Sequence, residues 1–141
     1  MPDLLSYKYE VYRKLIHISS SLIAILLWYF GKKDLLIWII AIAIIFPILD
    51  YYRKKITLLK HIYIRLYGNV TRPHEHYSLS GASWVFIGAG ITTLLFNEKI
   101  AVIAILVMSL SDSAAALIGI KYGKTKFFNK SLEGTLSFFI I

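Results

Sequence analysis

Cysteine is absent from the 141-residue chain, and charged residues make up only 17% of it. Without cysteine the chain forms no disulfide, no thiolate metal site and no cysteine nucleophile, so zinc-finger and thiol-enzyme classes are excluded. The hydrophobic share of 57% is about ten points above that of an ordinary soluble domain, and the charged share is about a third lower. This composition indicates a membrane protein.

The few charges that are present are unbalanced. Sixteen Lys and Arg residues stand against eight Asp and Glu residues, which gives a formal net charge of +8. In a soluble protein such an excess would suggest nucleic-acid binding, but here the charges lie between long apolar runs. We therefore expect no nucleic acid as a partner, and instead expect anionic lipid headgroups and nucleotide phosphates.

Four apolar segments are long enough, or nearly so, to cross a hydrocarbon core that requires about 20 helical residues. They cover residues 15–30, 35–49, 79–96 and 100–120. A fifth helix begins after Gly134, but the residues from 135 to 141 are too few to cross, so we expect a fragment or a partner that supplies the missing wall. The predicted fold class is all-α: a polytopic transmembrane helical bundle of four spans plus the start of a fifth, one membrane domain over residues 1–141 truncated at its C-terminus.

Lys and Arg collect in three of the segments outside these spans. The N-terminus holds three, residues 51–78 hold six and residues 121–131 hold four, against two at 32–33 and one at 99. Because cytoplasmic loops are enriched in Lys and Arg, the N-terminus and these two loops are predicted to be cytoplasmic. Within the loop 51–78, apolar residues recur at helical spacing between basic ones, which is typical of a helix lying in the membrane interface. The apolar residues are Ile56, Leu59, Ile62, Tyr63 and Leu66.

Asp112 stands inside the fourth span, about 13 Å of helix rise from Lys121. A carboxylate at membrane depth costs at least about 2.5–3.5 kcal/mol and is seldom kept without a use. In one interpretation Asp112 pairs with a basic residue of another helix and only fixes packing. In the other it lies at the bottom of a cytoplasm-facing pocket and holds Mg²⁺ while the metal binds phosphate.

The segment after this span has the glycines and lysines of a phosphate-binding loop but not its spacing. A P-loop needs four residues between its first Gly and the Gly-Lys-Ser/Thr, whereas three separate Gly119 from Gly123, and a membrane helix precedes them where a strand is required. What remains is a glycine turn among four lysines, Lys121, Lys124, Lys126 and Lys130. These lysines are either topology signals or, beside Asp112, contacts for anionic phosphates.

Further charged residues recur at short spacings elsewhere in the chain. In order, the motifs are Glu10-x-x-Arg13-Lys14-x-x-His17, Asp50-x-x-Arg53, Arg72-x-x-Glu75, Ser111-Asp112-Ser113-Ala114-Ala115, Gly119-x-x-x-Gly123-Lys124 and Lys130-Ser131-x-Glu133-Gly134. Taken together and in this order, they resemble the polyprenol kinase family, which includes dolichol, phytol and farnesol kinases and the CTP-dependent diacylglycerol kinase of yeast. The region from Asp112 to Gly134 is also similar to the phosphatidate cytidylyltransferases of the same broad superfamily.

The resemblance implies an enzyme: a kinase that uses CTP or another nucleoside triphosphate to phosphorylate a membrane lipid alcohol of polyprenol, phytol or diacylglycerol type at the cytoplasmic face. One alternative is a phosphatidate cytidylyltransferase that makes CDP-diacylglycerol. A second is a non-enzymatic membrane subunit or transporter in which Asp112 is an ion or proton site. The lipid, the donor nucleotide and the oligomeric state, including a homo-oligomer, stay open.

The resemblance also implies roles for individual residues. Asp112 would bind Mg²⁺, with Glu133 as a second metal contact or an orienting group. His17 or Glu75 would orient or deprotonate the lipid hydroxyl. Contacts to the nucleotide phosphates would come from Arg13, Lys14, Arg53, Arg72, Lys124, Lys130, Ser131 and Gly134.

Overall fold

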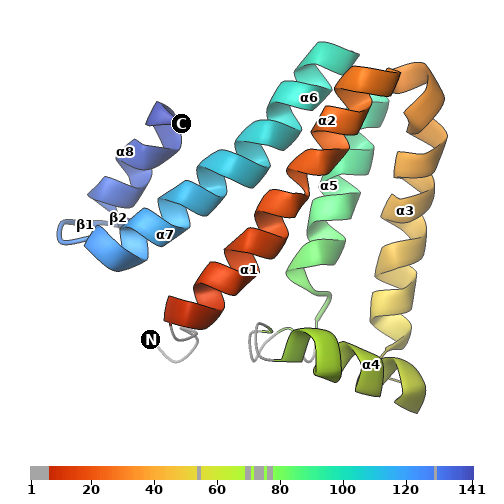
Figure 1. Cartoon of the computed structure of the whole chain (residues 1–141), viewed down its shortest axis with the longest axis horizontal. Helices are drawn as coiled ribbons and strands as arrows, with labels where there is room; N and C mark the ends of the chain where they lie inside the picture. Colours follow the sequence, from red (N-terminus) through yellow and green to blue (C-terminus); the bar gives the residue numbers. More distant parts are fainter. Residues whose placement is uncertain (1–6, 54, 69–70, 72–74, 76–77, 129) are drawn as a thin grey trace.

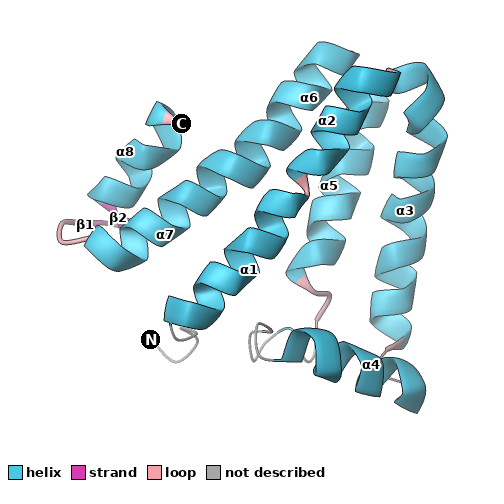
Figure 2. Cartoon of the chain, viewed as in Figure 1, coloured by secondary structure: helices cyan, strands magenta, loops and turns pink. Residues whose placement is uncertain are grey.

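The computed structural model describes residues 7–53, 55–68, 71, 75, 78–128 and 130–141, and nearly all of them are helical (Figure 2). The helical elements are α1 (Tyr7–Ser19), α2 (Ser21–Phe30), α3 (Lys32–Tyr52), α4 (Thr57–Tyr67), α5 (Gly81–Leu95), α6 (Glu98–Leu106), the π-helical segment η3 (Val107–Ser111), α7 (Asp112–Tyr122) and α8 (Leu132–Ile140). Two short strands between α7 and α8, β1 (Lys126–Phe127) and β2 (Lys130–Ser131), pair antiparallel. The all-α membrane fold is confirmed, and this small hairpin is a departure from it.

Among the described residues, three stretches of helix are long and apolar enough to cross a membrane. They are Tyr7–Phe30, formed by α1 and α2, Lys32–Tyr52, which is α3, and Glu98–Tyr122, which runs from α6 through α7. The fourth expected span, residues 79–96, contains α5, which is apolar but has 15 residues. That length gives about 22 Å of helix against a hydrocarbon core of about 30 Å. The segment is therefore shorter than the sequence predicted.

Hydrogen bonds at both ends of α5 explain its length. Ser80 is extended, and its N–H donates to Asp50 Oδ2 at 2.7 Å, so the helix begins at Gly81. At the other end Asn97 is extended, and its side chain accepts from the N–H of Ile100 at 3.0 Å, which caps the start of α6. Both ends are therefore fixed by polar groups that hydropathy alone does not detect.

The helices form two groups that meet at one end and separate at the other (Figure 1). In one group α3 packs along α5, and α4 crosses below them in the figure. In the other, α2 packs on α6, α1 packs on η3 and α7, and α7 packs on α8. Contacts between α2 and α3 and between α5 and α6 join the groups, whereas α1 and α4 lie at the separated end.

Most buried side chains are small or polar, and most large apolar side chains face outward. The buried apolar residues are Ala24, Leu27, Ala89, Ala101, Val102 and Ile105. In contrast, Ile37 is 73% exposed and Trp38 is 66% exposed. This distribution suits a protein whose exterior is solvated by lipid, because small residues let helices approach closely and apolar residues face the hydrocarbon.

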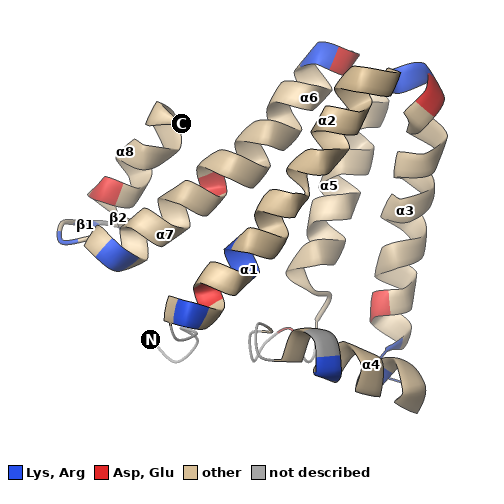
Figure 3. Ribbon diagram, in the orientation of Figure 1, with Lys and Arg blue, Asp and Glu red and all other residues tan. Residues whose placement is uncertain are grey.

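Charged residues gather near the ends of the helices, with two exceptions inside the bundle (Figure 3). The exceptions are Asp112, within the long helix of α6 to α7, and the charged face of α1 that contains Lys14. The helix predicted in the loop 51–78 is confirmed as α4, which carries Lys60 and Arg65 as well as exposed apolar residues such as Leu58.

Candidate active site

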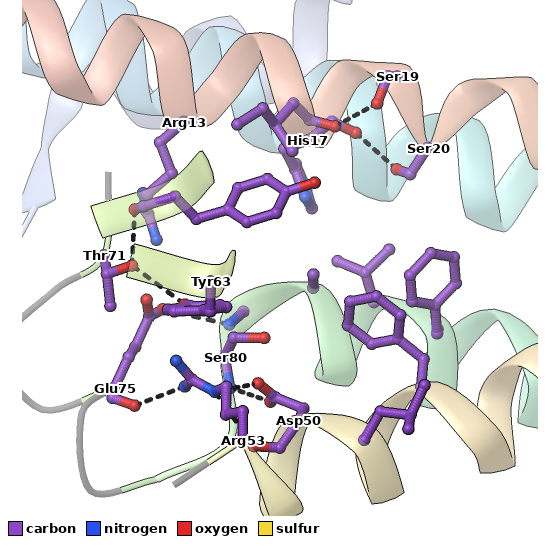
Figure 4. A pocket seen from close by; sticks show the side chains of 18 of the residues that line it. Arg13, His17, Ser19, Ser20, Asp50, Arg53, Tyr63, Thr71, Glu75 and Ser80 are labelled. Atoms are coloured by element: carbon purple, nitrogen blue, oxygen red, sulfur yellow. Dashed lines mark hydrogen bonds and ion pairs between the residues drawn. The ribbon is translucent and has the colours of Figure 1, made fainter. Parts of the chain in front are cut away.

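A cavity of ≈ 650 Å³ lies between α1–α2 on one side and α3, α4 and α5 on the other (Figure 4). One part of its lining is hydrocarbon, with Leu22 and Leu26 from α2, Phe46 from α3 and Phe86 from α5. The rings of Phe46 and Phe86 lie 4.8 Å apart, so they pack as a pair across α3 and α5. Another part of the lining is charged or hydrogen-bonding, and most of it comes from two separate clusters of side chains.

The first cluster, here the Asp112 cluster, consists of Lys14, His17 and Asp112. Lys14 Nζ donates to Asp112 Oδ2 at 2.5 Å, and His17 Nε2 lies 3.6 Å from the same oxygen. Lys14 is buried, whereas the Asp112 side chain is 53% exposed. Lys14 lies in α1 and Asp112 lies in α7, and the two residues are 98 positions apart in the sequence. The packing contact that one interpretation of Asp112 expected is therefore present, and the carboxylate is still accessible from the cavity.

The π-helical segment η3 contributes to the orientation of this cluster. A π-helix bonds i→i+5 and so rearranges the carbonyls of one turn, and such segments occur frequently at functional sites. Here the carbonyl of Met108 lies 3.0 Å from His17 Nε2. This contact joins α1 to η3 and fixes the ring of His17 beside Asp112.

Arg13 lines the cavity next to this cluster and is held by its own helix. Its Nε and Nη2 donate to Glu10 Oε1 at 3.2 and 2.9 Å. Glu10 is 2% exposed, so this is a partly buried ion pair within one turn of α1. The i, i+3, i+4 and i+7 spacing seen in the sequence thus brings the four polar residues of α1 to one face.

The second cluster, here the Arg53 cluster, forms the opposite polar wall and contains Asp50, Arg53, Tyr63, Thr71, Glu75 and Ser80. Arg53 Nε lies 2.5 Å from Asp50 Oδ1, and Arg53 Nη2 donates to the carbonyl of Glu75 at 2.8 Å. Asp50 Oδ2 accepts from the N–H of Ser80 at 2.7 Å and from the Ser83 hydroxyl at 2.6 Å. These bonds tie the end of α3 to the start of α5.

Tyr63 joins α4 to the same cluster. The Arg53 guanidinium stacks on its ring with 3.6 Å from Cζ to the ring centroid, and its hydroxyl lies 3.0 Å from the hydroxyl of Thr71. Burial raises the pKa of the Tyr63 hydroxyl above its ordinary value, so the phenol stays protonated and available as a hydrogen-bonding group.

A third polar region lies at the connection of α7 and α8. Glu133 Oε1 accepts from the N–H groups of Lys124 and Thr125, each at 3.1 Å. Its own backbone amide and these two N–H groups hold the pKa of the Glu133 carboxyl below its usual value. Ser131 caps α8, since its hydroxyl accepts from the N–H of Gly134 at 3.2 Å.

The glycines of this region permit the close packing of α7 on α8. A Cβ on Gly134 would lie 2.7 Å from the carbonyl oxygen of Ala115, and one on Gly123 would lie 2.2 Å from the carbonyl oxygen of Gly119. Side chains at these positions would push the hairpin away from α7. The positive charge of Lys130, on this hairpin, acts on Asp112 at longer range.

Comparison with known proteins finds relatives that are named as lipid kinases. It is 33% identical over 142 residues to the CTP-dependent diacylglycerol kinase 1 of Schizosaccharomyces pombe, covering 96% of this chain and 64% of that protein. It is 32% identical over 139 residues to the Saccharomyces cerevisiae protein of the same name (95% and 48%) and 30% identical over 138 residues to the phytol kinase of Synechocystis (91% and 53%). The chain belongs to the polyprenol kinase family.

The chain spans about half to two thirds of the length of these polyprenol kinase relatives. No family model matches it, and no solved structure matches it. Because the alignments cover more than nine tenths of this chain, both walls of the cavity and the α7–α8 connection lie largely within the region shared with the family.

The fold divides the residues that the sequence proposed for a polyprenol kinase site into two groups. Six of them line the cavity: Arg13, Lys14, His17, Arg53, Glu75 and Asp112. Five lie at the α7–α8 connection outside it: Lys124, Lys130, Ser131, Glu133 and Gly134. Arg72 lies outside the described residues. Tyr63, Thr71 and Ser80 also line the cavity and were missed, although the helical spacing of the loop 51–78 did place Tyr63 on an apolar helix face.

The donor set fits a magnesium ion that is shared with a phosphate ligand. Among the residues that the structure describes, no three His, Asp or Glu side chains gather as a metal site. Asp112 offers a single carboxylate, and its ion pairs with described residues use Oδ2. Mg²⁺ is commonly held by one or two carboxylates together with substrate phosphates and water, so one half-exposed carboxylate beside cations suits it.

Proposed function

We propose that the chain carries the catalytic cavity of a kinase that transfers the terminal phosphoryl group of CTP, or of another nucleoside triphosphate, to the hydroxyl of a membrane lipid alcohol. The observation that carries this proposal is that a hydrocarbon-lined cavity leads to the paired Lys14 and Asp112. A lipid chain in the apolar part brings its hydroxyl to the charged part. Relatives named as CTP-dependent diacylglycerol kinase and phytol kinase support this donor and this kind of acceptor.

In the proposed reaction the lipid oxygen bonds to the γ-phosphorus while the bond from that phosphorus to the β,γ-bridging oxygen breaks, giving a lipid phosphate and CDP. The hydroxyl proton is lost in the same reaction, and His17 beside Asp112 is positioned to orient the hydroxyl or to accept that proton. Glu75, on the opposite wall, is the alternative orienting group. Phosphoryl transfer depends mainly on positioning and charge neutralisation, which Arg13 and Lys14 supply.

Asp112 is the residue that would hold Mg²⁺, with the other ligands coming from phosphate and water. When bound, the metal neutralises charge on the phosphate oxygens. Lys124 and Lys130 would add phosphate contacts from the α7–α8 connection, on a turn whose shape depends on Ser131 and Gly134. Glu133 Oε1 already accepts from two N–H groups, so Glu133 would serve a metal mainly through Oε2.

We further propose that the reaction takes place at the cytoplasmic face and that the N-terminus is cytoplasmic. The support is the excess of Lys and Arg in the N-terminus and in loops 51–78 and 121–131. The start of α1, α4 and the end of α7, which border these segments, lie toward the lower side of Figure 1, and residues of α1 and α4 line the cavity.

The position of the transferred phosphorus tests this function. Membranes that contain the protein are incubated with CTP labelled at the γ-phosphorus, and separately at the α-phosphorus, together with prenols, diacylglycerol or phosphatidate. We expect only γ label in the lipid. Transfer of α label into phosphatidate alone would identify a cytidylyltransferase and contradict the proposal. Label from ATP but not CTP would retain the kinase and remove CTP as its donor.

A further inference from the structure

The helix α4 and the segment before it carry positive charge without a balancing carboxylate (Figure 3). Residues 51–74 contain six Lys and Arg residues and no Asp or Glu. Three of these cations, Lys55, Lys60 and Arg65, are exposed, and within the described part of the chain none of them forms an ion pair. None of the three lines the cavity or belongs to the motifs that resemble the polyprenol kinase family. The proposed phosphoryl transfer therefore leaves this charge unexplained.

Aromatic rings at the end of α3 mark the level of the membrane surface. Tyr51 and Tyr52 are exposed, and Lys55 Nζ lies 5.3 and 5.9 Å from their ring centroids. Exposed tyrosines and lysines at the end of a spanning helix are typical of the headgroup region. The helix α4 begins at Thr57, directly after this group, and crosses below α3 and α5 in Figure 1. We infer that α4 starts at the depth of the lipid headgroups.

The side chains of α4 divide into a face toward the cavity and a surface outside it. From α4 the cavity is lined by Leu59, Ile62, Tyr63 and Tyr67. These four cover about 140° of the helix circumference, and Lys60 and Arg65 lie just beyond its two edges. Leu58 is 68% exposed and lies outside the cavity, on the same side of the helix as Arg65. Cations at the edges of an apolar face are typical of a helix that contacts headgroup phosphates and acyl chains together.

We propose that this surface of α4, formed by Lys55, Leu58, Lys60 and Arg65, binds anionic phospholipids of the leaflet in which α4 lies. The inference goes beyond the proposed function and does not depend on it. A headgroup with a net negative charge is attracted by these cations more strongly than a zwitterionic one. A soluble phosphate would meet the same cations, but only a lipid also places an acyl chain against Leu58. Because the other face of α4 lines the cavity, a lipid bound here also supports one cavity wall.

The absence of cysteine allows a fluorescent probe to be placed beside this surface. Leu58→Cys in the full chain is labelled with bimane, and the protein is reconstituted in nanodiscs with rising fractions of phosphatidylserine or phosphatidylcholine that carry brominated acyl chains. Bromine quenches a fluorophore that it contacts, so quenching reports which lipid lies at α4. We expect brominated phosphatidylserine to associate about fivefold more tightly, with a preference that falls as salt is raised. Ile37→Cys, a site on α3 that is 73% exposed, should show no preference.

Paired charge removal assigns the preference to α4. Lys60→Gln together with Arg65→Gln should bring the preference at Leu58→Cys close to one. The matched control is Lys33→Gln together with Lys99→Gln, which removes two exposed cations at the other end of the bundle and should leave the preference unchanged (Figure 3).

Equal quenching by the two lipids at Leu58→Cys, an equal preference at Ile37→Cys, or an undiminished preference after both α4 substitutions would each overturn the inference. If the double variant fails to insert, Lys60→Gln and Arg65→Gln are measured singly; each should lower the preference, and an unchanged preference in both overturns the inference. Sodium phosphate is compared with sodium chloride at equal ionic strength. Loss of the preference in phosphate alone would assign these cations to a soluble phosphate ligand and contradict the lipid site.

Discussion

Asp112 combines two properties that seldom occur together within a membrane helix. Its carboxylate is paired with a buried lysine, and its side chain is nevertheless half exposed and lines the cavity. A group kept only for packing needs the first property and not the second. The geometry therefore fits both a packing role and a magnesium-binding role for Asp112. A measurement of Mg²⁺-dependent turnover separates the two roles.

Replacing Asp112 by Asn keeps the size and removes the charge. We expect Mg²⁺-dependent turnover to fall by about two to three orders of magnitude, the usual effect of losing a group that stabilises transition-state charge, while membrane insertion is retained. Asp34→Asn, a change of the same type at an exposed position at the start of α3, is the control and should be neutral. Turnover in Asp112→Asn equal to that of the unmodified protein would return Asp112 to a packing role.

Glu133 gives a prediction about pH. Because its folded pKa is depressed below the ordinary value of 4.5, its bonds to the loop are fully formed above that value and are lost as the pH falls through the folded pKa. Hydrogen exchange should show the amides of Lys124 and Thr125 protected at neutral pH and progressively less protected in acid, beyond the intrinsic change in exchange rate. In Glu133→Gln this pH-dependent step should disappear. Persistence of the step would show that another group holds the loop.

Among the helices, the contact of α3 with α5 fixes one wall of the cavity, and its closeness depends on Gly90. A Cβ at this position would lie 2.6 Å from the Cβ of Ala43, whereas one on Gly88 would meet nothing within 4 Å. We expect Gly90→Ala to lower the stability in detergent by about 1–3 kcal/mol through overpacking. Gly88→Ala should be neutral or stabilising by up to about 1 kcal/mol, because alanine favours the helix. Thermal unfolding that ranks the two variants in the opposite order would refute this packing.

Sequence periodicity predicted the helices well, but it did not predict the long-range contacts that fix where a helix begins. Apolar length predicted α2, α3 and the long helix of α6 to α7, and helical spacing predicted α4. The start of α5 depends on a bond from Ser80 to Asp50, 30 residues away, and this kind of contact leaves no local pattern. The β1–β2 hairpin is likewise too short for strand periodicity to reveal.

The candidate site shows the same division. The motifs identified the charged residues of the cavity, because charges between apolar runs are conspicuous. The pairing of Lys14 with Asp112 joins residues 98 apart, so spacing did not reveal which basic residue is the partner. The sequence pattern placed Tyr63 on an apolar helix face. Its stacking on Arg53 is seen only in the fold.

The proposed orientation of the protein in the membrane rests on its charge distribution and is open to a direct test. The chain has no cysteine, so single cysteines at positions 32 and 124 report on the two sides. With a cytoplasmic N-terminus, an impermeant thiol reagent added outside intact cells should label Lys32→Cys and spare Lys124→Cys. The reverse pattern of labelling would show that the proposed topology is inverted.

In the proposed function, one cavity brings the hydroxyl of a lipid alcohol to the Asp112 cluster. Photo-crosslinking with a lipid alcohol that carries a diazirine in its chain tests this arrangement, with the modified residues located by mass spectrometry. We expect labels on residues of the apolar lining, such as Leu26, Phe46 and Phe86, and their loss when excess unlabelled lipid alcohol competes. Labels confined to outward-facing residues such as Ile37 and Trp38, unaffected by competitor, would contradict it.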